Sequence, residues 1–472
     1  MKYGCPTRML LTVTVYVTLV FPGMAQETGK AAELPSFQLF RYDEDWRVLE
    51  DRSMHKHWLD SLKYISLGRA DWFITIGGEI RERFELLDHP NFGSGPADEN
   101  GYFLQRYLLS SDFHLGARVR FFGELQSGLA NGRAGGPRAT DLNRLDVHQA
   151  FLDWRVFSSD TNIITIRIGR QEIGFGSGRL LSPAEGLNVR RSMDGARLTV
   201  KLGKVVWNMT ALRLVRPLQD IFDDVPDHTQ TMWGTGMTAP HVIWKGANNS
   251  LYYYGLDRKN NVFVKGVGRT IRHTIGSRSW KKAGGWDFNY EVIVQWGSFE
   301  GRPIRAWALS EDTGYVFGHN RFQPRIGIRA DVASGDAGPR AQALGSFDPL
   351  LAAAPVYSGP SGLLGPTNLI DLAPTLRAVL RRNLTFALEC AFFWRTSLHD
   401  GVYTPAVIPI RAGSPTAGRY VATAPSVTMT WNASRHTTLS TIFTRFFRGE
   451  YFDNLPPARN VIYLSTSLSY RF

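Results

Sequence analysis

Hydrophobic and polar residues alternate with a period of two along most of the chain from residue 72 to residue 472. In segment 286–296 one face carries Trp286, Phe288, Tyr290, Val292, Val294 and Trp296, and the other carries Asp287, Asn289, Glu291, Ile293 and Gln295. Segments 384–395 and 462–472 repeat the pattern, and aromatic residues lie near the ends of all three. Because successive side chains of a strand point to opposite faces, the pattern predicts a sheet with one apolar and one polar face.

The length of these segments and of the connections between them favours a membrane barrel. The segments exceed the roughly 5 to 6 residues typical of strands in a soluble sandwich, which is the alternative fold. Connections alternate between tight turns such as 203–204 and 381–383 and long Gly- and Pro-rich loops such as 170–191 and 334–368. We therefore predict an all-β protein, a single transmembrane antiparallel β-barrel of about 18 strands with long extracellular loops and short periplasmic turns. Segments 232–239 and 269–278 show the weakest alternation, so 16 strands stays open.

The first 25 residues resemble a secretory signal peptide. Lys2 and Arg8 precede an apolar stretch, and Gly23, Met24 and Ala25 form a small-residue cleavage site. Beyond this stretch, no apolar run is long enough for a membrane-spanning helix. The predicted organisation is a signal peptide at 1–25, a charged periplasmic leader segment at 26–71 and an outer-membrane barrel at 72–472. After cleavage Cys390 is the only thiol, so an internal disulfide is excluded.

Arginine dominates the charge of the chain, which has a formal net charge of +12 and contains 43 Arg against 11 Lys. If the apolar face meets lipid, the polar face lines the lumen and selects what passes. A guanidinium group stays charged and binds carboxylates through a planar fork, which suits acidic solutes. Cross-strand Arg and Glu ladders that only fill the lumen are the structural alternative. The candidates on the polar face are Arg81, Arg83, Arg118, Arg120, Glu124, Arg329 and Asp331.

Evidence for catalysis, a metal or nucleic-acid binding is weak. The run 174–178 is rich in glycine but lacks the lysine of a P-loop, and its glycines are better explained by a loop that bends back along the lumen wall. His55 and His57 lack partners with metal-ligand spacing. Basic residues are spread over many strands, which disfavours nucleic acid. We expect no enzyme, no metal and no cofactor; an outer-membrane hydrolase is the alternative from another class.

Several motifs resemble those of the alginate export family of outer-membrane proteins. The clearest run contains Ile168-Gly169-Arg170-Gln171-Glu172, Gly176-Ser177-Gly178-Arg179-Leu180, Asn188-Val189-Arg190-Arg191 and Asp194-Gly195-Ala196-Arg197. Further similarity lies at Arg305-Ala306-Trp307-Ala308, Asp312-Thr313-Gly314-Tyr315, Arg329-Ala330-Asp331, Phe347-Asp348-Pro349 and Phe392-Phe393-Trp394-Arg395. The resemblance covers most of residues 42–472 in the same order.

The resemblance implies an 18-stranded barrel with an Arg-rich constriction, a gating loop in the lumen and passive export of an alginate-like polyuronate. By motif position, the constriction candidates are Arg170, Glu172, Arg190, Arg191, Asp194 and Arg197, and segment 127–144 occupies the place of the gating loop. The expected partners are the anionic polysaccharide, outer-membrane lipid and lipopolysaccharide, periplasmic secretion proteins, and the barrel assembly machinery, which would read Phe472. We expect a monomer in the bacterial outer membrane. A general or small-anion porin remains the alternative within transport.

Overall fold

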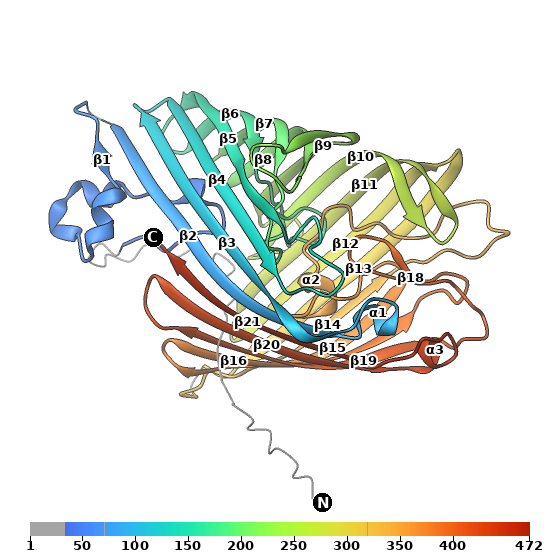
Figure 1. Cartoon of the computed structure of the whole chain (residues 1–472). Helices are drawn as coiled ribbons and strands as arrows, with labels where there is room; N and C mark the ends of the chain where they lie inside the picture. Colours follow the sequence, from blue (N-terminus) through green and yellow to red (C-terminus); the bar gives the residue numbers. More distant parts are fainter. Residues whose placement is uncertain (1–33, 70, 319) are drawn as a thin grey trace, which may run out of the picture.

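The wall of the molecule is one antiparallel sheet that closes on itself. The structure is a computed structural model that describes residues 34–69, 71–318 and 320–472, and the predicted signal peptide lies outside them. Its 18 wall strands (Figure 1) are β2 (Trp72–Asp88), β3 (Asp98–Leu115), β4 (Val119–Asn131), β5 (Asn143–Ser158), β6 (Asn162–Gln171), β7 (Met193–Leu202), β8 (Val205–Arg216), β9 (Val225–Pro240), β10 (Asn248–Phe263), β11 (Gly266–Ala283), β12 (Trp286–Phe299), β13 (Arg302–Val316), β14 (Arg325–Ala333), β15 (Leu369–Arg381), β16 (Leu384–Arg395), β19 (Tyr420–Asn432), β20 (Thr437–Arg448) and β21 (Val461–Arg471). The predicted fold class is confirmed.

The first and last wall strands close the barrel. β21 pairs with β2 from Glu79 opposite Arg471 to Asp88 opposite Ile462. Phe472 continues this pairing, because its backbone exchanges hydrogen bonds of 2.8 and 3.1 Å with Gly78. Both weakly patterned segments belong to wall strands, 232–239 to β9 and 269–278 to β11. The count of 18 strands is therefore correct, and 16 is not.

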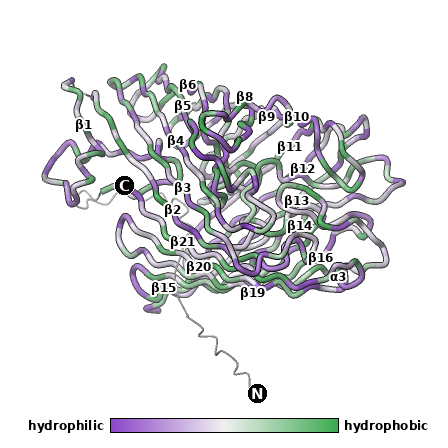
Figure 2. Tube along the Cα trace, viewed as in Figure 1, coloured by the Kyte–Doolittle hydropathy of each residue, from purple (hydrophilic) through white to green (hydrophobic). Residues whose placement is uncertain are grey.

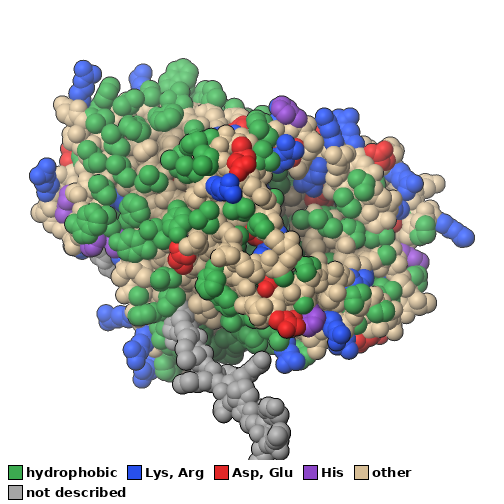
Figure 3. Space-filling model, in the orientation of Figure 1, with side chains coloured by type: hydrophobic (Ala, Val, Ile, Leu, Met, Phe, Trp, Pro, Cys, Tyr) green, Lys and Arg blue, Asp and Glu red, His purple; other side chains and the backbone are tan. Residues whose placement is uncertain are grey.

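The two faces of the wall differ as the alternation predicts. In β12, Val292 and Val294 are 49% and 46% exposed, whereas Glu291 and Gln295 are 3% and 1% exposed. Hydrophobic and hydrophilic residues are interspersed along the visible strands (Figure 2), and apolar side chains spread over the visible outer wall while Lys and Arg project from its ends (Figure 3). An apolar outer band between charged ends is the arrangement of a barrel that spans a bilayer.

Short turns gather at one rim and long loops at the other. The short-turn rim holds connections such as 203–204, 284–285 and 382–383, and the long-loop rim holds 172–192, 334–368 and 396–419. Two hairpins at the long-loop rim are also tight, at 264–265 and 300–301. In outer-membrane barrels the short turns face the periplasm.

Two long loops fold into the barrel and contact each other. Leu351 donates a backbone hydrogen bond of 2.9 Å to Leu180, and Ser182 donates one of 3.1 Å to Leu351. Leu180, Leu181, Leu350 and Leu351 are buried with residues of β7 to β10 and β12 to β14 in the largest apolar cluster. The loops 172–192 and 334–368, here called the inner loops, are therefore fixed to the wall. The segment that matched a gating loop by position is shorter, since β4 continues to Asn131 and residues 135–139 are exposed.

Glycines allow the first inner loop to run close to the wall. Gly176 and Gly178 have φ values of +67° and +81°, a region that favours glycine. On β9, a Cβ atom at Gly236 would lie 2.5 Å from the ring of Phe175, so the absence of a side chain there makes room for that ring. The glycine-rich run 174–178 thus serves the path of the loop.

The segment before the barrel folds at the short-turn rim. It contains the 3-10 turns η1 (Arg41–Asp43), η2 (Arg47–Glu50), η3 (Arg52–Met54) and η4 (Trp58–Leu62), followed by β1 (Ile65–Ser66), which pairs with β2. These turns lie beside β1, at the same end of the barrel as the C-terminus (Figure 1).

The remaining elements are short and lie in loops. They are α1 (Pro90–Gly93), α2 (Pro355–Ser358), α3 (Glu450–Asp453) and the paired strands β17 (Val402–Tyr403) and β18 (Pro409–Arg411). Within the described ranges, no helix has the length and apolar character needed to span a membrane.

Candidate functional site: an arginine-rich lumen

One ion network fastens the first inner loop to β2 and β3. Arg106 is fully buried, and its Nη2 lies 2.5 Å from both Glu79 Oε1 and Glu185 Oε1. Glu79 belongs to the wall and Glu185 to the loop, so a single guanidinium bridges the two. Arg471 Nε, on the closing strand, adds a contact of 3.0 Å to Glu79 Oε2.

Arg81 and Arg83 hold the same loop through its backbone. Arg81 donates to the carbonyl oxygens of Glu185 and Leu187 at 3.0 and 2.7 Å, and Arg83 donates to that of Gly186 at 2.7 Å. Arg83 also forms an ion pair of 2.9 Å with Glu85. These two guanidinium groups therefore position the loop and have little capacity left for a solute.

Arg190 is the centre of the charged contacts inside the loop. Its Nε lies 2.5 Å from Glu172 Oε1, and its Nη1 lies 2.9 Å from Glu185 Oε2. Glu172 also accepts from the ring of His148 at 2.8 Å. Potential ligand atoms of Glu124, His148 and Glu172 lie within 4.8 Å of one another. Arg190 compensates the charge of Glu172, so this cluster is an ion network as it stands.

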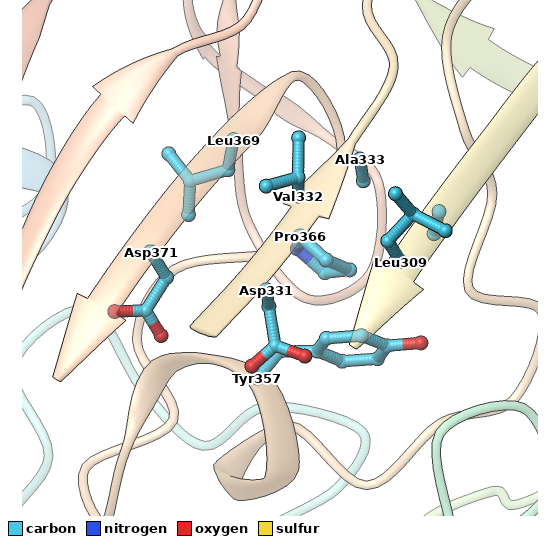
Figure 4. Close-up of a pocket in the computed structure, with 9 residues that line it drawn as sticks. Leu309, Asp331, Val332, Ala333, Tyr357, Pro366, Leu369 and Asp371 are labelled. Atoms are coloured by element: carbon cyan, nitrogen blue, oxygen red, sulfur yellow. The ribbon is translucent and has the colours of Figure 1, made fainter. Parts of the chain in front are cut away.

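A second network surrounds Arg329 on β14. Its Nη1 binds Asp331 at 2.9 Å and also contacts Asp371, while its Nη2 binds Glu389 at 2.8 Å. Arg179 of the inner loop adds a contact of 3.2 Å to Asp331. Asp331 and Asp371 extend from adjacent strands beside Tyr357 (Figure 4), at a pocket also lined by Leu309, Val332 and Leu369. Wall carboxylates therefore neutralise the charge of Arg329.

Arg191 and Arg197 differ from these residues because they bind no carboxylate within the described part of the chain. Arg191 donates to the carbonyl oxygens of Ser182 and Leu351 at 3.0 and 2.6 Å. Arg197 lies on the inward face of β7 and donates from Nε and Nη2 to Asn208 Oδ1 at 3.0 and 2.8 Å. Its Nη1 has no hydrogen-bond partner among the described residues, and the side chain lines a pocket with Phe175 and Tyr254. Among the sequence-predicted residues, Arg197 is thus the guanidinium best placed to meet a solute.

The structure brings most of the sequence-predicted residues to the lumen but leaves three apart. Together lie Arg81, Arg83, Arg120, Glu124, Glu172, Arg190, Arg191, Arg197, Arg329 and Asp331. Arg118 is exposed in the turn between β3 and β4. Arg170 and Asp194 form an ion pair of 2.9 Å near the long-loop rim, on the strand face that carries Ile168, which is 59% exposed. These three do not join the inward-facing set.

Four further residues belong to the networks although the sequence alone does not give their contacts. Arg106 and Arg179 connect the wall to the inner loop, as described above. Arg41 and Tyr42 enter from the segment before the barrel: Arg41 Nη2 lies 3.3 Å from Glu79, and the Tyr42 hydroxyl donates to the Glu172 carbonyl at 3.1 Å. The alternation that marks wall strands is absent from segment 41–42, so no periodic signal identifies them.

Three acidic residues also lie close together at the long-loop rim. Their surroundings predict that the stability of the loop depends on pH. Carboxylate oxygens of Asp146, Asp223 and Asp224 lie within 4.8 Å of one another. Burial raises the pKa of Asp224 to about 6, the charge of Asp146 adds to the rise, and the Leu218 amide, Arg170 and Asn143 oppose it. A folded-state pKa above the ordinary value of about 3.9 means that the protonated form favours the folded loop.

We therefore expect loop 217–224 to be more stable at pH 5 than at pH 7.5. The stability that protonated Asp224 adds to the loop is lost as the pH rises through about 6. Hydrogen exchange of the loop, corrected for the intrinsic rate, measures this. Asp224→Asn should abolish the difference, whereas Asp220→Asn, at an exposed residue paired with Arg144, should retain it. Equal protection at both pH values in the wild type contradicts the prediction.

Comparison with known proteins agrees with this architecture. The fold is that of outer-membrane porins: a BenF-like porin from Pseudomonas fluorescens Pf-5 aligns with a TM-score of 0.58 at 11% identity, over 84% of this chain and 98% of that one. Pseudomonas aeruginosa OpdK, solved with vanillate, aligns with a TM-score of 0.56 at 10% identity, over 84% and 98% of the two chains. No curated protein matches.

Fold and lumen together define a barrel of the outer-membrane channel class. The model of the alginate export family matches residues 73–460, and the chain belongs to this family. The predicted family is confirmed.

Proposed function

We propose that the barrel lets an anionic polysaccharide of the alginate-like polyuronate type pass passively outward through the outer membrane. The observation that carries the proposal is Arg197, a lumenal guanidinium that no described wall carboxylate neutralises. The paired arginines hold the first inner loop beside it. A polyuronate presents one carboxylate per sugar, so it exchanges contacts from one lumenal cation to the next, and weak sites in series permit conduction.

The remaining arginines support the proposal through the shape of the path. Arg81, Arg83 and Arg190 fasten the first inner loop, and that loop narrows the lumen beside Arg197. A narrow path lined by cations discriminates by charge more strongly than a wide aqueous pore, because less water screens the passing carboxylates.

A planar bilayer experiment tests the proposal on the full-length mature protein. We expect a reversal potential that shows anion selectivity under a salt gradient, and a concentration-dependent block by oligouronates that strengthens with chain length. Conductance without selectivity or block would contradict the proposal and favour a general porin. Neutral oligosaccharides of the same length are the control, since they match the size of the oligouronates and lack their charge.

A small-anion porin is the second candidate. It is favoured by the fold shared with OpdK, which was solved with vanillate, a single carboxylate on an aromatic ring. The same bilayer distinguishes the two, because a small-anion porin would bind monouronates as tightly as longer chains. Little in the structure supports a hydrolase. No serine hydroxyl among the described residues is hydrogen-bonded to a histidine ring. The ring of His148 binds Glu172, and the hydroxyl of Ser177 binds Glu291.

A further inference from the structure

The segment before the barrel extends into the lumen and reaches the first inner loop. Tyr42 is 4% exposed, and its ring packs edge-on against those of Phe122 and Phe151 on the inward wall. Its hydroxyl donates to the Glu172 carbonyl at 3.1 Å. A few residues earlier, the Leu39 carbonyl accepts from Arg190 Nη2 at 3.1 Å. The segment before the barrel, which is held at the short-turn rim, therefore touches a loop that starts at the opposite rim.

The inserted segment presents oxygen atoms to lumenal arginines. Arg190 and Arg120 donate to its backbone carbonyls at Leu39 and Tyr42. The guanidinium of Arg167 stacks 4.0 Å from the centre of the Tyr42 ring. Three cations of the lumen thus have part of their bonding capacity taken up by this segment.

Asp43 adds a carboxylate at the same place. The side chain of Asp43 is exposed, and it directly follows Tyr42, whose ring packs on the inward wall. Desolvation by the surrounding protein raises the pKa of Asp43, and the charges of Arg167, Arg197 and Arg120 act against the rise. Among these three, Arg167 and Arg120 have Asp153 and Asp112 as wall partners, whereas Arg197 has no carboxylate partner among the described wall residues. Asp43, in the segment before the barrel, is an acid whose charge acts on Arg197.

The parts of the segment on either side of Asp43 are anchored. Arg41 is paired with Glu44 at 2.9 Å and with Glu79 at 3.3 Å. Trp46 is 2% exposed, with Lys63 stacked 4.9 Å from its ring and Arg435, in the turn before β20, at 5.0 Å. The stretch around Trp46 is therefore held at the short-turn rim, and residues 39–43, the tip of the segment, lie among the lumenal charges.

We propose that residues 38–45 are a tethered acidic occupant of the lumen, which competes with the polyanion for Arg197 and its neighbours. The proposal rests on the proposed function and names a regulation of the same site. Asp43 stands where a uronate carboxylate would sit, and the carbonyl oxygens of Leu39 and Tyr42 occupy donors that hydroxyl and carboxylate oxygens of a sugar chain would use. A polymer that arrives at the short-turn rim displaces the tip, while the anchor around Trp46 retains the segment for return.

Two aspartates separated by one residue provide a matched test. Asp43 directly follows Tyr42 in the inserted stretch, whereas Asp45 pairs with Arg47 in solvent, where both side chains are more than half exposed. In planar bilayers the full-length mature Asp43→Asn variant should be half-blocked at an oligouronate concentration about three- to tenfold lower than the wild type, the effect of removing one competing charge. Asp45→Asn removes the same charge and should behave as the wild type.

Tyr42→Ala provides an independent second variant. It removes the ring that packs on Phe122 and Phe151, so the tip should leave the lumen more often, which raises single-channel conductance and lowers the half-blocking concentration. Heat-modifiable mobility on a gel shows that each variant still forms a folded barrel. Block with the same half-blocking concentration in wild type, Asp43→Asn and Tyr42→Ala would overturn the tethered occupant and leave the proposed function standing. Absence of block in every variant would overturn the proposed function, and this proposal with it.

Discussion

Arg329→Met should destabilise the barrel by about 3–5 kcal/mol, the effect expected when one member of a buried ion network is removed. Arg329 is 7% exposed and contacts Asp331, Asp371 and Glu389. Asp331 and Asp371 are direct cross-strand neighbours in the register of β14 and β15. Without the guanidinium, like charges would face each other across two strands in a site that water reaches poorly. The temperature at which the folded band is lost on a semi-native gel measures the effect.

Two further variants separate this cause from a general loss of charge. Asp371→Asn in the Arg329→Met background should restore part of the stability, because it removes one of the opposed carboxylates. Arg144→Met, at an exposed residue whose ion pair with Asp220 is solvated, should lie within about 0.5 kcal/mol of the wild type. An Arg329→Met barrel as heat-stable as the wild type would show that the carboxylates do not need their shared cation.

The wall of the barrel could be predicted from the sequence because strand alternation is a local property. Each residue of β12 is assigned to lipid or lumen by its parity, and exposed Val292 beside buried Glu291 follows that assignment. The strand count follows from the same signal, since a membrane barrel must keep its alternation over every span. Even the weakly patterned β9 and β11 are long strands in the structure.

The contacts of the lumenal charges could not be predicted in the same way. Arg106 and Asp112 share one face of β3, yet Arg106 binds Glu79 of the adjacent strand and Glu185 of the inner loop. Asp112 instead binds Arg120 of β4. These choices depend on the register between strands and on the path of a loop, which parity within one strand does not contain.

The sequence motifs also group residues that have different surroundings in the structure. Arg170 and Arg190 come from the same motif-rich run, but Arg170 lies at a strand end near the long-loop rim and Arg190 is buried among Glu172 and Glu185. Arg197 is distinguished from both only by what surrounds it, an asparagine and no wall carboxylate. Charge balance at one side chain requires all of its neighbours, and these come from distant parts of the chain.

Arg197→Gln should weaken the block by oligouronates by about tenfold or more, because a hydrogen bond to a charged group contributes roughly 1.5–3 kcal/mol and each 1.4 kcal/mol is a factor of ten. The change removes a lumenal cation that no described wall carboxylate neutralises, so the reversal potential should also move toward lower anion selectivity. Glutamine retains an amide that can bond Asn208, which limits disturbance of β7 and β8.

The control for Arg197→Gln is Lys204→Gln, which removes the same charge from the exposed turn between β7 and β8. It should leave the half-blocking concentration unchanged, because a charge in solvent at the rim is screened within about 8–10 Å. If Arg197→Gln were blocked as strongly as the wild type and kept its reversal potential, the polyanion would pass along another part of the lumen. If both variants lost block equally, net charge rather than position would govern entry, and the tethered Asp43 would compete with the polymer only through its charge.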